Sequence, residues 1–308
     1  MTTLLFTHPA CLAHDTGPGH PERPARLAAV LKGLSGPEFA GLGRREAPEA
    51  TIEQLALAHP RSQIEAVLAA IPAEGRIMLD GDTVASPGSR EAALRAAGAV
   101  VAAVDAIVGG EADNAFCAVR PPGHHAEPGQ AMGFCLFNNV VVGAYHARRH
   151  HGLRRIAVVD FDVHHGNGTE TQARSDPDLF YASTHQSPLY PGTGNHNDRR
   201  HPNIVNAPLP PRSGSEEFRA VMAHDVLPAL RAFRPELVIV SAGFDAHIDD
   251  PLAEMRLGEA DYGWVTEELL SIAAGCAKGR LVSALEGGYD LGALARSSAA
   301  HVAALLAA

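Results

Sequence analysis

The sequence predicts a single α/β domain with a central, mostly parallel sheet and helices on both of its faces. Short runs rich in Val, Ile and Leu alternate with longer Ala- and Leu-rich stretches along the 308 residues, as in proteins built from strand–helix units. The strand candidates are continuously apolar, which is typical of parallel strands buried on both faces. No repeat, low-complexity tract or linker divides the chain, so residues 1–308 are expected to form one domain.

Six short apolar runs are the expected strands. They are residues 4–7, 115–119, 156–160, 179–183, 237–241 and 281–285. Six longer stretches with helical composition are the expected helices, at residues 24–34, 91–108, 138–150, 216–233, 260–278 and 292–306. Several of them end at helix-stop signals, such as Gly109-Gly110, Gly152 and Pro235.

Composition excludes several classes of protein. A net charge of −10 argues against nucleic-acid binding, which needs a basic face. No uncharged apolar run approaches the ~18 residues of a membrane span, and the first residues lack the basic and apolar regions of a signal peptide. The four cysteines form no C-x-x-C pair and are expected to be reduced thiols, which predicts a cytoplasmic protein.

Polar residues cluster just after four of the expected strands. The segments are RPPGHH after residues 115–119, DFDVHHGNG at the end of 156–160, AGFDAH after 237–241 and EGGYD after 281–285. In a parallel sheet these carboxyl ends lie along one edge, where open α/β folds bind their ligands. The four segments are therefore expected to meet in one site.

Asp162, His164 and Asp245 are the candidate metal ligands in these segments. Asp162 and His164 are two residues apart in a segment expected to be extended, so their side chains would point the same way. Three protein ligands leave a coordination position open, as in catalytic zinc sites, and the same donors would also accept Fe²⁺ or Co²⁺. The alternative is that Asp162 caps a helix and His164 is an ordinary hydrogen-bonded histidine.

His124 and His125 are the candidate proton-transfer groups, because imidazole titrates near neutral pH. Each needs a partner on its second ring nitrogen, and Asp160 and Asn167 are the candidates. Tyr289 follows two glycines that permit a sharp turn, and its phenol is placed to donate to a developing oxyanion. Taken singly, HH in a Pro/Gly loop is more often a surface pair, and GGY is more often only a turn.

With these residues assembled, the sequence resembles the histone deacetylase superfamily, which also contains bacterial acetylpolyamine amidohydrolases. The resemblance rests on the segments already quoted together with GHPERP at 19–24, DGDTVASPGS at 80–89, GFCLFNN at 133–139, YPGTG at 190–194 and AGFDAHIDDPL at 242–252. It implies an arginase/deacetylase-like fold with a central sheet of about eight strands.

The resemblance also implies roles for individual residues. Asp162, His164 and Asp245 match the zinc ligands of the family, His124 and His125 its tandem catalytic histidines, and Tyr289 its carbonyl-polarising tyrosine. Asp160 matches the partner of His124, and Asn167 stands where class II-like members carry Asn. A family potassium site corresponds to Asp160, Asp162, His164, Ser183 and Thr184.

A substrate channel is implied as well, with Phe134 and Tyr190 as aromatic walls around an acyl-lysine stem. The other residues that match it are His20, Asp82, Gly133, Leu252, Gly287 and Gly288. Polyamine-selective relatives carry an acidic residue where this chain has Leu252.

The function that these matches imply is zinc-dependent hydrolysis of N-acyl primary amines. The substrate would be acetyl-lysine in a protein or peptide, or a small acetylated amine; an acetylpolyamine amidohydrolase is the alternative. An arginase-type binuclear ureohydrolase needs extra carboxylates that are missing around Asp162 and Asp245. A non-catalytic, metal-bound sensor would be expected to lack a ligand, a tandem histidine or the tyrosine, and none is missing. A homo-oligomer is possible.

Overall fold

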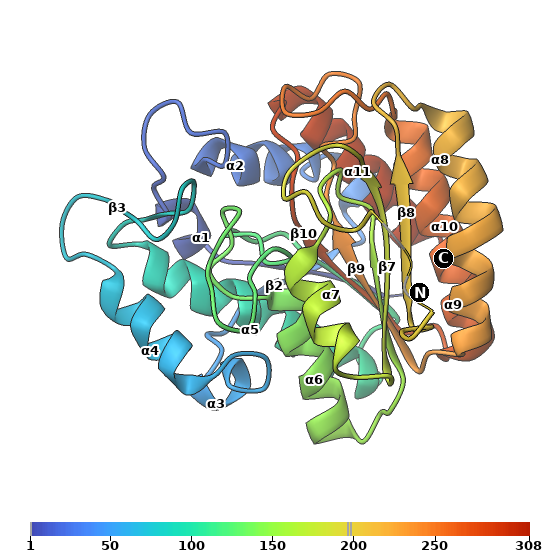
Figure 1. Ribbon diagram of the computed structural model, residues 1–308, viewed down its shortest axis with the longest axis horizontal. Coiled ribbons are helices and arrows are strands. Elements are labelled where there is room, and N and C mark those ends of the chain that lie inside the picture. Colours follow the sequence, from blue (N-terminus) through green and yellow to red (C-terminus); the bar gives the residue numbers. More distant parts are fainter. Residues whose placement is uncertain (1, 196, 198) are drawn as a thin grey trace.

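The computed structural model describes residues 2–195, 197 and 199–308 (Figure 1). Its described residues form an eight-stranded sheet in the order β2-β1-β5-β10-β9-β6-β7-β8, and every pair of neighbours in it is parallel. The strands are β1 (Thr3–Thr7), β2 (Gly43–Glu46), β5 (Asn114–Cys117), β6 (Ile156–Asp160), β7 (Leu179–Gln186), β8 (Ile204–Leu209), β9 (Leu237–Ala242) and β10 (Leu281–Leu285). The predicted fold class, including the approximate number of strands, is confirmed.

The centre of the sheet is the core of the protein. Every residue of β5, β6, β7, β9 and β10 is buried, because helices cover these strands on both sides. β2, at one edge, has the sequence GRRE and is largely exposed. Its arginines and glutamate discourage pairing with another chain at that edge.

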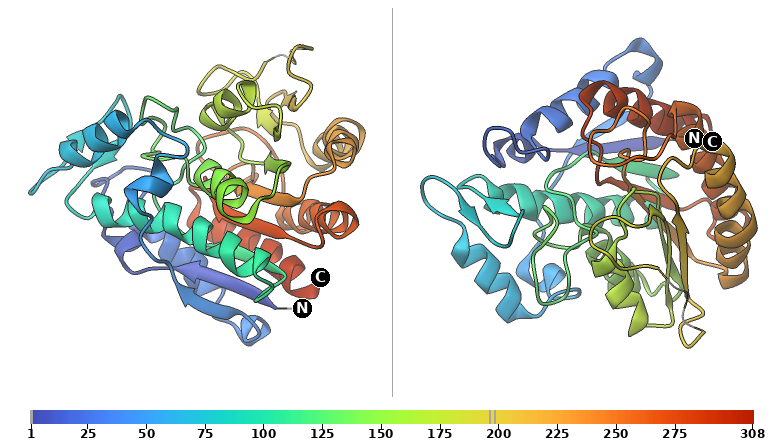
Figure 2. Two further views of the ribbon diagram at one scale, coloured as in Figure 1. Left: turned by 90° about the horizontal axis from the view of Figure 1, so that it is seen from below. Right: turned by 45° about the horizontal axis from the view of Figure 1, so that its top comes forward.

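Two groups of helices cover the two faces of the sheet (Figure 2). One face carries α5 (Ser89–Val108), α6 (Asn139–His151) and α7 (Asn167–Arg174). The other carries α2 (Pro24–Gly33), α8 (Ser215–Val221), α9 (Leu227–Phe233), α10 (Glu259–Cys276) and α11 (Leu291–Ala307). Helical connections that run toward the β8 edge of the sheet cross one face, and those that run toward the β2 edge cross the other. Right-handed crossovers require this arrangement.

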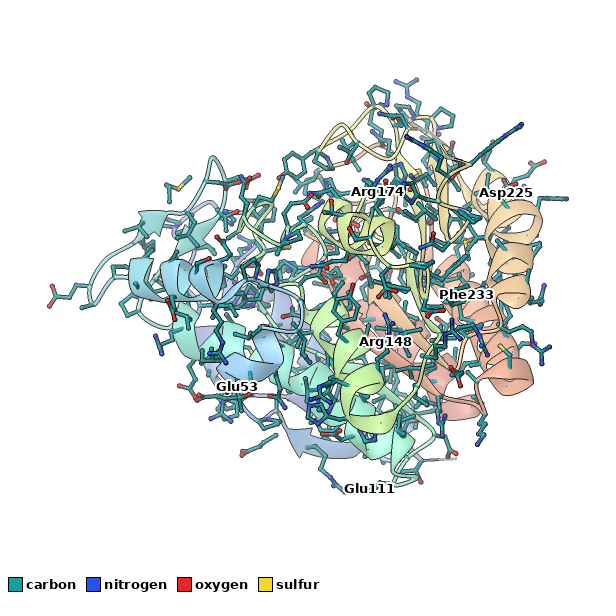
Figure 3. All side chains as sticks on the ribbon, turned by 60° about the horizontal axis from the view of Figure 1, so that its bottom comes forward. Glu53, Glu111, Arg148, Arg174, Asp225 and Phe233 are labelled. Carbon is teal, nitrogen blue, oxygen red and sulfur yellow. The ribbon has the colours of Figure 1, made fainter. Side chains whose placement is uncertain are left out.

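The expected helices are confirmed, with ends shifted by one or two residues, except for the one at 216–233. That stretch contains α8 and α9 joined by a π-helical turn, η2 (Met222–Val226). Pro228 lies in the first turn of α9 and has no N–H to donate to the preceding turn, so the regular α-helical hydrogen bonding is interrupted there. The π turn occupies this place, as single π turns inside α-helices do. Phe233, which is labelled in Figure 3, ends α9. Its ring centroid lies 5.2 Å from that of Phe180 on β7.

Several elements were not expected from the sequence. They are the edge strands β2 and β8, the small antiparallel pair β3 (Ile77–Met78) and β4 (Val84–Ala85), and the helices α1 (Ala10–Ala13), α3 (Ile52–Leu55), α4 (Arg61–Ala70) and α7. Two expected strand ends differ by more than one residue, because β5 ends two residues early at Cys117 and β7 continues to Gln186. Of the described helices, none combines the length and the apolar character that crossing a membrane requires.

Candidate active site

The four segments that were expected to meet do meet. β5, β10, β9 and β6 are consecutive neighbours in the sheet, and the segments that follow them carry His124 and His125, Tyr289, Asp245, and Asp162 with His164. All these strands point the same way. Their carboxyl ends therefore place the candidate residues side by side at one edge.

Asp162, His164 and Asp245 form a buried group with converging donor atoms. The Nδ1 atom of His164 lies 3.1 Å from Oδ1 of Asp162 and 3.0 Å from Oδ2 of Asp245, and the three ligand atoms lie within 4.8 Å of one another. The expectation that 162–164 is extended is wrong, because the chain bends immediately after β6. The bend turns both side chains toward Asp245.

This group fits a small divalent cation. Burial, with the neighbouring Asp162 carboxylate, raises the pKa of Asp245 to about 7, as happens when two carboxylates share one buried space. Gly243 and Gly287 leave room beside them: a Cβ at Gly243 would overlap the carboxylate of Asp162, and one at Gly287 would overlap both carboxylates. Two carboxylate oxygens and one imidazole nitrogen are a donor set that zinc accepts.

The two adjacent histidines have different partners. Nδ1 of His124 lies 2.9 Å from the carboxylate of Asp160, whereas Nδ1 of His125 lies 2.8 Å from the amide oxygen of Asn167. That amide oxygen can only accept, so Nδ1 of His125 carries the proton and Nε2 is left as an acceptor. The amide nitrogen of Asn167 donates to Glu127 at 2.6 Å, which fixes this orientation of the amide.

The two histidines also differ in their electrostatic surroundings, which shift their pKa values in opposite directions. Burial alone would lower the pKa of His124, but the carboxylates of Asp160 and Asp162 raise it well above its usual value. Burial lowers the pKa of His125 well below its usual value, and charge on His124 and His164 lowers it further. At neutral pH, His125 is therefore the member of the pair that can accept a proton.

The ring of Tyr289 is buried next to a cation. The guanidinium carbon of Arg26 lies 4.8 Å from the ring centroid, and the backbone N–H of Tyr289 donates to Asp250 at 2.7 Å. Burial raises the pKa of the phenol well above its usual value. The hydroxyl consequently keeps its proton and can donate it in a hydrogen bond.

A cavity of about 220 Å³ opens onto this group. Its lining residues are Asp82, His125, Gly133, Phe134, His164, Leu189, Tyr190, Leu252 and Tyr289. Five of the predicted channel residues line it, and the rings of Phe134 and Tyr190 lie 6.0 Å from Tyr289 and 5.1 Å from His125, respectively. Leu189 was not predicted, because an apolar residue next to an aromatic one carries no distinguishing signal.

Three predicted channel residues lie outside the cavity wall. His20 lies behind Phe134, with ring centroids 4.8 Å apart, and its Nε2 is 3.1 Å from the carbonyl of Asp82. Gly287 lies beneath the candidate ligands, and its N–H donates to Asp162 at 2.7 Å. Gly288 packs against Phe244 and Leu294 with φ at +121°. Tyr289, the next residue, reaches the cavity because these glycines let the chain approach the ligands closely.

The predicted potassium residues lie on β6, on β7 and in the bend after β6. Asp160 and Ser183 are partners in the β6–β7 register, and the hydroxyl of Thr184 is buried without a hydrogen bond to any described residue. An unpartnered buried oxygen is costly, and a cation near it would supply the missing partner. One oxygen of the predicted potassium site is thus left without a protein partner among the described residues.

The sequence did not indicate the buried ion pairs that support the site. Glu286 accepts from the backbone N–H groups of Gly123, at 2.7 Å, and His124, at 3.2 Å. Arg26 donates to the carbonyls of Glu286 and Gly288. Arg26 and Arg120 both pair with Glu22, and all four charged side chains are fully buried. The network ties the loop at 19–24 to the loops after β5 and β10.

Comparisons with known proteins identify the family. A family profile described as "Histone deacetylase domain" matches residues 20–305. The chain is 38% identical to "Histone deacetylase 14, chloroplastic" of Arabidopsis thaliana over 98% of this chain and 76% of that protein. It is 40% identical to "Histone deacetylase-like amidohydrolase" of Pseudomonas aeruginosa over 94% of this chain and 82% of that protein. The solved structure "Crystal Structure of HDA15 HD domain" superposes with a TM-score of 0.90 at 33% identity, covering 98% of this chain and 88% of that one. The chain therefore belongs to the histone deacetylase family.

Proposed function

We propose that this chain is a zinc-dependent deacetylase and that residues 1–308 act as one catalytic domain. Its substrates would be N-acyl primary amines: acetyl-lysine in proteins or peptides, or small acetylated amines. The observation that carries the proposal is that one cavity joins the candidate ligand His164, the neutral His125 and the phenol of Tyr289. The relative from Pseudomonas aeruginosa that is named an amidohydrolase supports the same chemistry.

The candidate ligands Asp162, His164 and Asp245 would hold the metal. Bound there, zinc would supply Lewis acidity toward the amide carbonyl; Fe²⁺ or Co²⁺ fits the same donors. Potassium would be held by Asp160, Asp162, His164, Ser183 and Thr184 and would offset the charge of the buried carboxylates.

The protein's own groups would move the proton and stabilise charge. Nε2 of His125 takes a proton from the attacking water while Asn167 keeps a proton on Nδ1. The hydroxyl of Tyr289 donates to the carbonyl oxygen as it becomes negative. The imidazolium of His125 then returns the proton to the departing amine, so that water and amide yield a carboxylic acid and an amine. The acid passes its remaining proton to the amine, and the products at neutral pH are a carboxylate and an ammonium ion. Phe134 and Tyr190 shield the acyl stem from water.

Replacing Tyr289 with phenylalanine tests the oxyanion role. Losing one preorganised donor is expected to lower kcat by about 10²–10³-fold. The ring still packs against Arg26, so metal content and melting temperature should not change. Steady-state kinetics on an acetyl-lysine peptide, with elemental analysis of the same sample, measure both. A variant with wild-type kcat would remove Tyr289 from the mechanism.

Glu127 is expected to act as a positioning residue, because its carboxylate holds the amide of Asn167 in the orientation that serves His125. Glu127→Ala removes this acceptor and is expected to lower kcat about 10-fold, as is typical when an outer hydrogen-bond partner is lost, with little change in KM. Glu127→Gln keeps an acceptor oxygen and should recover most of the rate. A purely structural role would instead give both variants the same loss together with a lower melting temperature.

Metal dependence and substrate class are tested together. Chelator-treated protein is expected to lose activity and to recover it with Zn²⁺ or Co²⁺, measured in parallel on acetyl-lysine peptides, acetylputrescine and acetylspermidine. If metal-loaded protein hydrolyses none of these amides, the proposal fails and the non-catalytic sensor becomes the better account. Urea release from arginine would instead favour the ureohydrolase.

An acetylpolyamine is the second candidate substrate. Asp82 lines the cavity, and a carboxylate there would attract a cationic amine. Leu252 lines the same cavity and provides no second acidic group. Rates on the acetylated polyamines in the same screen decide between the two. The net charge of −10 argues against nucleic acid as a partner. The cytoplasmic location and homo-oligomerisation remain predictions.

A further inference from the structure

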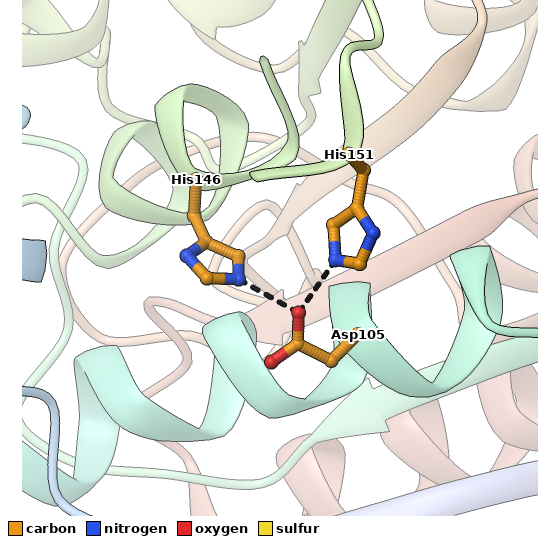
Figure 4. A group of neighbouring side chains, drawn as sticks. All are labelled: Asp105, His146 and His151. Carbon is orange, nitrogen blue, oxygen red and sulfur yellow. Dashed lines mark hydrogen bonds and ion pairs between the residues drawn. The ribbon is translucent and has the colours of Figure 1, made fainter. Parts of the chain in front are cut away.

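A second group of metal-binding side chains lies away from the cavity. Asp105 is in the last turn of α5, and His146 and His151 are on α6 (Figure 4). The two helices cover the same face of the sheet, and each leads into the amino end of a strand, β5 or β6. Their carboxyl ends therefore lie at the edge of the sheet opposite the candidate active site.

The three side chains converge on one carboxylate oxygen. Oδ1 of Asp105 lies 2.7 Å from Nε2 of His146 and 2.6 Å from Nε2 of His151. All three donor atoms lie within 4.8 Å of one another. His146 is buried, whereas the side chains of Asp105 and His151 are 50% and 24% exposed. The buried histidine is fixed, and the other two residues keep the group open to solvent.

The group lies at the carboxyl ends of α5 and α6. At that end of a helix the dipole favours positive charge, so the location favours a bound cation.

We propose that Asp105, His146 and His151 form a second divalent-metal site that takes Zn²⁺, with water completing the coordination. Ligand atoms in a tetrahedral zinc site lie about 3.3 Å apart, from the usual zinc–ligand distances of about 2.0–2.1 Å. Each of the two contacts must therefore lengthen by about 0.6–0.7 Å. Asp105 and His151 are exposed enough to make that movement, while His146 is buried.

The site has a consequence for counting metals in this protein. Two zinc ions per chain would not by themselves indicate a binuclear centre of the arginase type, because the second ion would be bound at the opposite edge of the sheet. A second ion in the active site would persist when His151 is replaced, whereas an ion at this site would not. The experiment therefore has to locate the second ion as well as count it.

The test uses full-length, tag-free protein whose active site is already loaded with zinc. The protein is dialysed against micromolar Zn²⁺, and bound zinc is counted by elemental analysis. The wild type is expected to hold about two ions per chain, and His151→Asn and Asp105→Asn about one. His150→Asn, which removes a neighbouring histidine that does not contact Asp105, should still hold two. All four proteins should deacetylate at the same rate.

Thermal unfolding provides a second measurement. Added Zn²⁺ should raise the melting temperature of the wild type and His150→Asn by about 2–5 °C and should leave that of His151→Asn unchanged. The proposal is overturned if the wild type holds only one zinc, or if His151→Asn holds as many ions as the wild type. It is also overturned if His150→Asn loses the second ion. Melting temperatures without added metal show whether each variant is folded.

Discussion

Replacing His125 with alanine is expected to lower kcat by about 10²–10⁴-fold, the usual contribution of a general base, while the metal content stays unchanged. His125 lines the cavity, its pKa is held low by burial, and its Nε2 is free because Asn167 accepts from Nδ1. No other neutral imidazole with a free nitrogen lines the cavity among the described residues. Steady-state kinetics and elemental analysis on the same preparation measure the two quantities.

The variant Asn167→Asp tests the same role through pH. A carboxylate on Nδ1 favours the charged imidazole and raises the pKa of His125. The base then needs a higher pH to lose its proton, so the acid limb of the kcat/KM profile should move to higher pH. If His125→Ala keeps nearly wild-type rates, or if Asn167→Asp leaves the acid limb in place, His125 is not the base.

The sequence was sufficient to predict which residues meet, because parallel strands place their carboxyl ends at one edge. It did not contain the order of the strands. β5, β10, β9 and β6 are neighbours only because crossovers on both faces interleave segments far apart in the chain. The prediction was therefore correct about the convergence of Asp162, Asp245 and Tyr289, but it could not say which strand lies next to which.

The two missed strands of the eight-stranded sheet lie at its edges, β2 at one and β8 at the other. β2 reads GRRE and β8 contains Pro208, so neither has the continuous apolar run that marks a buried strand. Edge strands tolerate charged residues and proline because one side of their backbone faces no other strand. Backbone hydrogen bonding to β1 holds β2 in place, and backbone hydrogen bonding to β7 holds β8. Sequence composition gives no sign of such pairing.

The missed residues of the site are buried charges. Glu22, Arg120 and Glu286 would be placed at the surface by their chemistry, since charged side chains are rarely buried unless they are paired. The carboxylate of Glu22 meets Arg120, 98 residues along the chain, and Glu286 meets the backbone of Gly123. Only the folded chain brings such partners together, so no local pattern could predict their burial.

Gly287→Ala is expected to weaken metal binding by about 100-fold or more, and activity with it. This exceeds the usual cost of an outer-partner change, because the added Cβ would overlap the carboxylates of both Asp162 and Asp245. Neither carboxylate is free to move away. The other oxygen of Asp245 accepts from Val163 N–H at 2.8 Å, and that of Asp162 accepts from His164 N–H at 2.9 Å.

The matched control for this variant is Gly275→Ala. Gly275 lies in the last turn of α10, and an added Cβ would meet no atom within 4 Å beyond its chain neighbours and the backbone of its own helix. This change should therefore preserve metal content and activity, and it favours the helix. Metal affinity is measured by competition with a chromophoric chelator, and folding by circular dichroism. Gly287 does not line the cavity, so the substitution does not act by touching the substrate. A variant that folds but has lost its metal would therefore show that Gly287 acts through the ligands Asp162 and Asp245. If Gly287→Ala keeps the metal affinity of the wild type, the carboxylates of Asp162 and Asp245 can move aside. They would then not hold the metal in the arrangement described above.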